Sequence, residues 1–184
     1  MLHPTWLAEF EDEIEDADHE EFSLRWFALS VICLALFIGQ TDVTVLNVAL
    51  PTISADLDAS TSDLQWVMDS YAVMLAAFVL LGGGIADRFG RKRVFIAGFA
   101  LFGAGGLAGS FSSDVAQLIV SRAVMGLGAA LFFPPALSLI TVHFRSGERA
   151  RAVAIWAGVG GAATAFGPVL GEFWWRRSAG VRYC

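Results

Sequence analysis

Apolar stretches long enough to cross a lipid bilayer recur along most of this 184-residue sequence, and they restrict its fold more than any other feature. A helix needs about 20 consecutive, mostly apolar residues to cross the hydrocarbon core. In lipid, backbone polar groups must be paired within the structure, which favours helices. We therefore predict an all-α, polytopic transmembrane bundle of about five spans. The spans are expected at residues 24–50, closed by Pro51, and at 64–85, 94–111, 115–140 and 152–173.

The charged residues are few and unevenly placed. They make up 16% of the sequence, compared with about a quarter in soluble domains. Nine of the 18 acidic residues lie between Glu9 and Glu21. Such dense like charge favours disorder, so residues 1–22 are expected to form an acidic, disordered tail, with a short surface helix as the alternative. A cleavable signal peptide has a basic start directly before its apolar segment, whereas this N-terminus is acidic. The first span is therefore expected to stay uncleaved.

The placement of lysine and arginine predicts the orientation of the spans. The basic residues cluster in the segments after the second and fourth expected spans: Arg88, Arg91, Lys92, Arg93, Arg145, Arg149 and Arg151. The segments 51–63 and 110–114 contain neither residue type. Because cytoplasmic loops are enriched in lysine and arginine, the N-terminus is expected in the cytoplasm of a cell-membrane protein. Arg176, Arg177 and Arg182 lie on the expected outer side and break the rule.

Several classes of function lack their sequence signals. No basic patch suited to nucleic acid occurs, and two cysteines, Cys33 and Cys184, do not make a disulfide framework. A phosphate-binding G-x-x-x-x-G-K-[ST] loop is absent as well. We expect no enzyme activity, cofactor or metal site. The expected surroundings are the lipid bilayer, and the energy for transport would come from the proton gradient.

Three ionisable residues lie inside the apolar stretches, namely Asp42, Asp69 and Arg122. Ionisable groups at this depth are costly unless they face a cavity or a partner. A partly desolvated carboxylate could bind a proton or a cation, but not both at once. Arg122 needs a carboxylate or a backbone carbonyl as acceptor. For Asp69 the alternative is an interfacial position in the first turn of its helix.

The segment from Gly83 to Arg93 combines small residues, an acid, a turn glycine and a basic cluster between two expected helices. It resembles the signature between the second and third helices of the major facilitator superfamily. The matching residues are Gly83, Asp87, Arg88, Gly90, Arg91 and Lys92. The alternative is that the arginines serve only as a topology signal, which does not explain the acid and the glycines.

Three further segments resemble the 14-helix drug:proton antiporters of that superfamily. Residues 41–51 are similar to the first-helix motif, and residues 118–126 to the fourth-helix motif, with Met125 in place of the usual glutamine. Glycines and a proline resemble the fifth-helix motif at Gly158, Gly167, Pro168 and Gly171. Residues 64–71 place Asp69 where exporters of quaternary ammonium compounds and cationic dyes carry an aspartate.

The resemblance implies a role for each motif in proton-coupled efflux of drugs or organic cations. Asp42 and Asp69 would bind cations or protons, and Arg122 would support proton coupling. Asp87 and its basic loop would form a cytoplasmic latch against a C-terminal half. The fifth-helix glycines and Pro168 would shape the helix that determines the direction of exchange.

The family pattern stops near Gly171, and residues 174–184 are expected to lie outside it. The transmembrane transporter region is therefore assigned to residues 23–173, an N-terminal half without its sixth helix. Two alternatives to transport by this chain remain. One is a truncated fragment without activity of its own, and the other is a small membrane protein that acts with a partner, such as a separately encoded C-terminal half.

Overall fold

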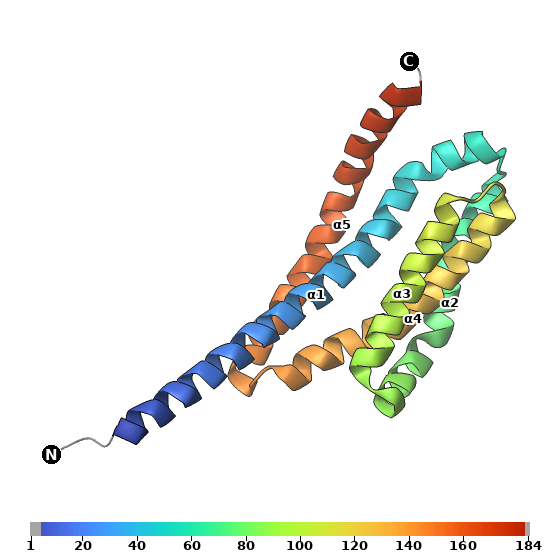
Figure 1. Ribbon diagram of the computed structural model, residues 1–184. Coiled ribbons are helices and arrows are strands. Elements are labelled where there is room, and N and C mark those ends of the chain that lie inside the picture. Colours follow the sequence, from blue (N-terminus) through green and yellow to red (C-terminus); the bar gives the residue numbers. More distant parts are fainter. Residues whose placement is uncertain (1–4, 183–184) are drawn as a thin grey trace.

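Five helices make up the protein (Figure 1). The computed structural model describes the backbone of residues 5–182 and the side chains of residues 24–166. The helices are α1 (Thr5–Leu57), α2 (Thr61–Phe89), α3 (Arg91–Ser110), α4 (Val115–His143) and α5 (Ser146–Arg182), and no strand occurs in this part of the chain. Helices α2, α3, α4 and the part of α1 from Leu24 are long and apolar enough to cross a membrane. The predicted all-α membrane fold is confirmed, while the span predicted at 152–173 extends beyond the described side chains.

The helices form two groups. Helix α4 packs along both α2 and α3, whereas α1 packs mainly along α5. Figure 1 shows α5 beside the middle of α1, with α2, α3 and α4 grouped next to them. The contact between the two groups is sparse and involves α1 with α4, α5 with α4 and α1 with α2. A residue that joins α1 to α4 is therefore one of the few that connect the two parts of the fold.

Small residues bring α4 close to its two neighbours. At Gly128, a Cβ atom would lie 2.5 Å from the backbone nitrogen of Phe102 and 2.8 Å from the carbonyl oxygen of Gly98, both on α3. Phe132 is 1% exposed and meets the rings of Phe99 and Phe102 edge-on, with centroids 5.7 Å apart. Because apolar side chains gain little by leaving lipid for protein, such close packing is the main source of association.

Helix α4 continues through Pro134 and Pro135. A proline has no N–H group, so Pro134 leaves the carbonyl of Ala130 without its usual helical donor. Gly82 of α2 lies against this carbonyl oxygen, closely enough that a Cβ atom at this position would overlap it. The Cα of a glycine can approach a carbonyl in this way and partly compensate for the missing bond. Tertiary packing thus supports a helix that two prolines would weaken.

The prediction that the first span ends at Pro51 is wrong. Helix α1 passes through Pro51 and ends at Leu57. A proline disfavours the helical conformation for the residue before it and removes one hydrogen bond, but neither effect prevents the helix from continuing. The turn that follows contains Asp58, whose φ is 48°. The backbone N–H of Asp63 donates to the Ser60 side chain, and the N–H of Ser60 donates to the Asp63 carboxylate, a capping box that starts α2.

The acidic N-terminal segment belongs to α1, whose backbone is helical from Thr5. The backbone is continuous with the first span, whereas the sequence analysis expected a disordered tail or, as the alternative, a short surface helix. The side chains of residues 5–23 lie outside the described part. The connections between the other helices are short, and a single residue, Gly90, separates α2 from α3.

Candidate functional site

A buried ion pair joins the two groups of helices. The Arg122 side chain of α4 donates from Nη1 to Oδ2 of Asp42 on α1, at 2.6 Å. The Arg122 side chain is 5% exposed and that of Asp42 is 24% exposed. The two residues are 80 positions apart in the sequence. The acceptor that an arginine at this depth requires is therefore a carboxylate, which itself keeps access to its surroundings.

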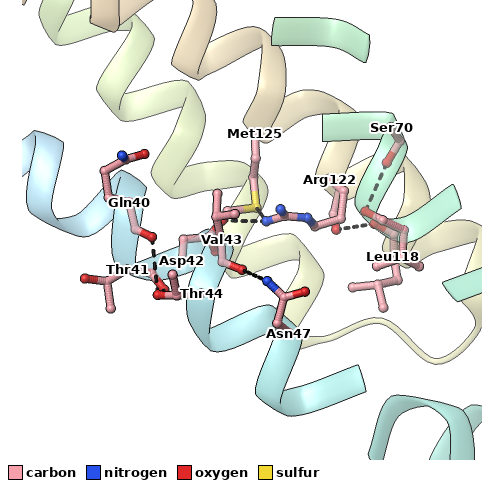
Figure 2. Close-up of polar contacts among 12 residues, drawn as sticks. Gln40, Thr41, Asp42, Val43, Thr44, Asn47, Ser70, Leu118, Arg122 and Met125 are labelled. Carbon is pink, nitrogen blue, oxygen red and sulfur yellow. Dashed lines mark hydrogen bonds and ion pairs between the residues drawn. The ribbon is translucent and has the colours of Figure 1, made fainter. Parts of the chain in front are cut away.

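Two further side chains contact the Arg122 guanidinium. Its Cζ atom lies 4.7 Å from the centroid of the Tyr71 ring on α2, in a cation–π arrangement. Its Nη1 atom also lies 3.6 Å from the sulfur of Met125, one turn further along α4. Figure 2 shows the guanidinium extending from α4 toward α1, with Met125 beside it. The Nε of Arg122 is buried and has no hydrogen-bond partner among the described residues. The ion pair with Asp42 is formed by Nη1.

The polar residues next to Asp42 bond to their own helix. Thr44 donates from Oγ1 to the carbonyl of Thr41 at 2.9 Å, and Asn47 donates from Nδ2 to the carbonyl of Val43 at the same distance (Figure 2). Such bonds satisfy side-chain donors within a membrane helix. The hydroxyl of Thr41, by contrast, is buried and has no hydrogen-bond partner among the described residues. Among these residues, the ion pair of Asp42 is the one with Arg122.

Asp69 does not join this site. It lies two residues before Tyr71 on α2, which places it about 200° away around the helix, and it is exposed whereas Tyr71 is buried. The structure thus brings Asp42 and Arg122 together and leaves Asp69 on another face. Its role in binding a cation or proton stays a prediction.

The segment between α2 and α3 forms a tight charged turn. Gly90 adopts φ of 96°, a conformation that other residues rarely adopt, so the turn glycine of the motif has a conformational reason. Across this turn, the Nη2 atom of Arg91 contacts Oδ1 of Asp87 at 3.0 Å. The guanidinium of Arg88 lies over the ring of Phe89, 5.7 Å from its centroid. Lys92 is exposed.

The glycines of the motif candidates differ in their surroundings. A Cβ atom at Gly83 would meet only the Cβ of Pro134, at 3.9 Å, and one at Gly158 would meet nothing within 4 Å. Gly160, by contrast, faces Leu36 of α1 at 3.2 Å. Packing therefore does not account for Gly158. The surroundings of Gly167, Pro168 and Gly171 lie outside the described part, although the backbone of these residues belongs to α5.

A comparison with models of protein families shows to which family the sequence belongs. The family model for the Major Facilitator Superfamily matches residues 32–183, which is most of the sequence. The chain belongs to the major facilitator superfamily. The match reaches into residues 174–184, the segment that the sequence analysis set outside the family pattern. As a superfamily member with several membrane-crossing helices, the chain is a multi-pass membrane protein.

Similar members of the superfamily are named for drug resistance or export. The methyl viologen resistance protein of Salmonella typhimurium is 38% identical over 157 residues, which cover 82% of this chain and 32% of that protein. The tetracenomycin C resistance and export protein of Streptomyces glaucescens is 38% identical over 146 residues, or 79% and 27% of the two chains. The methylenomycin A resistance protein of Bacillus subtilis is 40% identical over 145 residues, or 78% and 31%. The chain thus spans about a third of the length of these superfamily members.

The sequence alone did not identify two residues of this site. Tyr71 falls within the motif at residues 64–71, and Met125 stands out only because it replaces the usual glutamine. A signal for Tyr71 existed, because it follows Val67 by four residues and therefore shares its helix face, which is buried. Met125 follows Arg122 by three residues and therefore shares its helix face.

Proposed function

We propose that this chain forms part of a proton-coupled exporter of drugs or lipophilic organic cations. The observation that carries the proposal is the ion pair between Asp42 and Arg122, buried where the two groups of helices meet. Structural salt bridges in membrane helices are rare, and ionisable groups at this depth usually mark the path of an ion or a substrate. The names of the relatives, which include a methyl viologen resistance protein, support the same direction.

The chemistry follows from the competition for one carboxylate. Ionised Asp42 pairs with Arg122, and it could pair equally with an organic cation that approaches from its exposed side. A protonated Asp42 has lost its charge and holds neither partner strongly. Proton binding on one side of the membrane would then release a cation, which is the minimum requirement for exchange of the two. In this scheme Arg122 is the partner of the ionised carboxylate until a proton or a cation arrives.

The other motif residues have proposed roles around this exchange. By the positive-inside rule, the turn with Asp87, Gly90 and Arg91 faces the cytoplasm, as does the N-terminus. Its exposed groups, together with Arg88 and Lys92, would act as a latch against a second half of the transporter. Asp69 would contribute a second acidic group to cation binding.

The glycines and the proline of α5, at Gly158, Gly167, Pro168 and Gly171, would shape that helix for exchange. A Cβ atom at Gly158 would meet nothing within 4 Å in the described part of the chain, so another helix could pack against this position. Small residues of this kind let helices approach closely in lipid.

Ethidium export from a pump-deficient bacterial host tests the proposal. The chain is expressed alone and together with the C-terminal half of a relative, and cellular ethidium fluorescence is followed after energisation. We expect export that an uncoupler abolishes and that Asp42→Asn reduces at least tenfold. Asp58→Asn, the same change in an exposed turn, is the matched control and should retain export at equal expression.

The outcomes separate the alternatives. Export that survives Asp42→Asn contradicts the proposed role of the carboxylate. Export that needs the co-expressed half favours a protein that acts with a partner. Absence of export in both settings, with both proteins found in the membrane, favours a fragment without transport activity.

A further inference from the structure

The guanidinium of Arg122 is held from three sides, and only one of the three contacts depends on the charge of a carboxylate. Asp42 provides the ion pair at 2.6 Å, Tyr71 provides a ring face at 4.7 Å, and Met125 provides a sulfur at 3.6 Å. Tyr71 is 6% exposed and Arg122 is 4% exposed. The stack between them is therefore shielded from water, where a cation–π contact is at its strongest.

These contacts differ in what a proton does to them. Arginine stays charged at every pH that a cell meets, so protonation of Asp42 leaves a buried cation without its counter-ion. The ring face of Tyr71 and the sulfur of Met125 keep their electron density under the same conditions. They can therefore help to keep the guanidinium in place while Asp42 is neutral.

The packing of α2 on α4 fixes the position of the ring. Gly126 follows Arg122 by one helical turn, and a Cβ atom there would overlap the carbonyl oxygen of Tyr71 and lie 3.0 Å from its Cα. The missing side chain lets the backbone of α2 approach α4 at the level of the stack. A larger residue at this position would move Tyr71 away from Arg122.

We propose that Tyr71 is a positioning residue that holds the Arg122 guanidinium within reach of Asp42 in both protonation states of the carboxylate, with Gly126 setting the distance between their helices. The proposal rests on the proposed role of Asp42 as the proton-binding group and deepens it. With Tyr71 in place, the ion pair re-forms as soon as Asp42 loses its proton. Without the ring, the guanidinium turns away and the carboxylate loses its nearest positive charge.

The other groups that face Asp42 do not offer a competing explanation. Arg122 comes from α4 and Tyr71 from α2, and both are parts of the proposal. The charged residues of α3 are confined to positions 91–93, and those in the described part of α5 to positions 148–151. Both sets lie near helix ends. On α2, Asp69 is exposed and lies on another face than Tyr71, while Asp63, Asp87 and Arg88 lie near the ends of that helix. On α1, Arg25 lies 17 residues, or more than four turns, before Asp42.

Carbodiimide labelling of Asp42 tests the proposal without measuring transport. A hydrophobic carbodiimide reacts with protonated carboxyl groups in apolar surroundings, and peptide mass spectrometry reads the labelled fraction of Asp42 in the full chain, purified in lipid nanodiscs, as the pH is varied. For Tyr71→Leu we expect half-labelling at a higher pH than in the wild type, because loss of a nearby positive charge favours the neutral acid. Tyr71→Phe keeps the ring and should retain the wild-type half-labelling pH.

Gly126→Ala supplies a second variant that leaves all three contacting side chains intact. It should move the half-labelling pH in the same direction as Tyr71→Leu, and it replaces that variant if the leucine protein does not fold. A wild-type profile for folded Tyr71→Leu and Gly126→Ala overturns the proposal. So does a shift in Tyr71→Phe as large as that in Tyr71→Leu, since the hydroxyl rather than the ring would then matter. If the shifts occur but the chain exports no ethidium with a partner half, the positioning role holds and the transport proposal fails.

Discussion

The bundle of α2, α3 and α4 and the pair of α1 and α5 are built from the same kinds of residue but are held together differently. In the bundle, Gly126 and Gly128 each face backbone atoms so closely that a methyl group would collide. In α5, Gly158 and Gly161 face open space. The pair reaches the bundle through side chains, including Asp42 on Arg122. Close backbone contact thus holds α2, α3 and α4 together, while side-chain contact holds α1 against them.

The largest expected effect comes from cutting the link between the two parts. Asp42→Asn leaves the Arg122 charge buried without a counter-ion, so the free energy of unfolding should fall by about 3–5 kcal/mol. Unfolding in mixed micelles by increasing fractions of sodium dodecyl sulfate, followed by circular dichroism, measures it.

The double variant Asp42→Asn with Arg122→Leu is the control for that link. Removing both charges should cost much less than the sum of the two single changes. Additive losses would mean that the ion pair does not join α1 to the bundle, and the comparison between the two parts would lose its basis.

A methyl group added inside the bundle should come next in size. Gly128→Ala forces α3 away from α4 and should lower the free energy of unfolding by about 1–3 kcal/mol. Gly161→Ala is the matched change in α5. It should be neutral or stabilise by up to about 1 kcal/mol, since alanine favours the helix more than glycine does. Equal losses in the same micelle titration would show that the two parts are packed alike.

The turn between α2 and α3 tests the conformational requirement at Gly90, at the end of the bundle. Gly90→Ala places a side chain at φ of 96° and should cost about 1–2 kcal/mol. Gly147→Ala, at a site with open space near the start of α5, is the control and should change little. Thermal unfolding by circular dichroism compares the two, and a loss at position 147 that matched the loss at position 90 would contradict the conformational argument.

The smallest effect is expected for the exposed ion pair across the same turn. Asp87 is 67% exposed at its side chain and pairs with Arg91, so Asp87→Asn should cost about 0.2–1 kcal/mol. The difference should disappear in about 1 M salt, where charges are screened within roughly 3 Å. A loss comparable to that of Asp42→Asn, in the same titration, would mean that exposure does not distinguish the two acids.

Most of the fold could be predicted because apolar length is a strong signal. The second, third and fourth helices begin and end within about four residues of the predicted spans. Helix α1 begins earlier and ends later than its predicted span, and α5 is longer than its span at both ends. At the end of α1, the prediction treats Pro51 as a stop. Hydropathy and proline rules describe a local preference, whereas the helix from Pro51 to Leu57 continues until the turn at Asp58. The sequence around Pro51 does not indicate that the helix continues to Leu57.

The candidate site could be predicted in its parts but not in its assembly. Asp42 and Arg122 were recognisable because charges inside an apolar stretch are costly. That they pair with each other depends on the crossing of α1 and α4, which no spacing within either segment reveals. Tyr71 was hidden for the opposite reason, since an aromatic residue in a membrane helix is unremarkable until a cation is found on its face. Asp69 showed the same signal as Asp42 and lies elsewhere.

The brevity of the connections has a consequence for the turnover of the protein. Between residues 57 and 146 the helices are joined by three residues at 58–60, one at 90, four at 111–114 and two at 144–145. A protease needs several residues in an extended conformation, so these joints offer it almost no substrate. Degradation has to start from a terminus or wait for a helix to leave its neighbours, and limited digestion of the intact protein should leave this central region uncut.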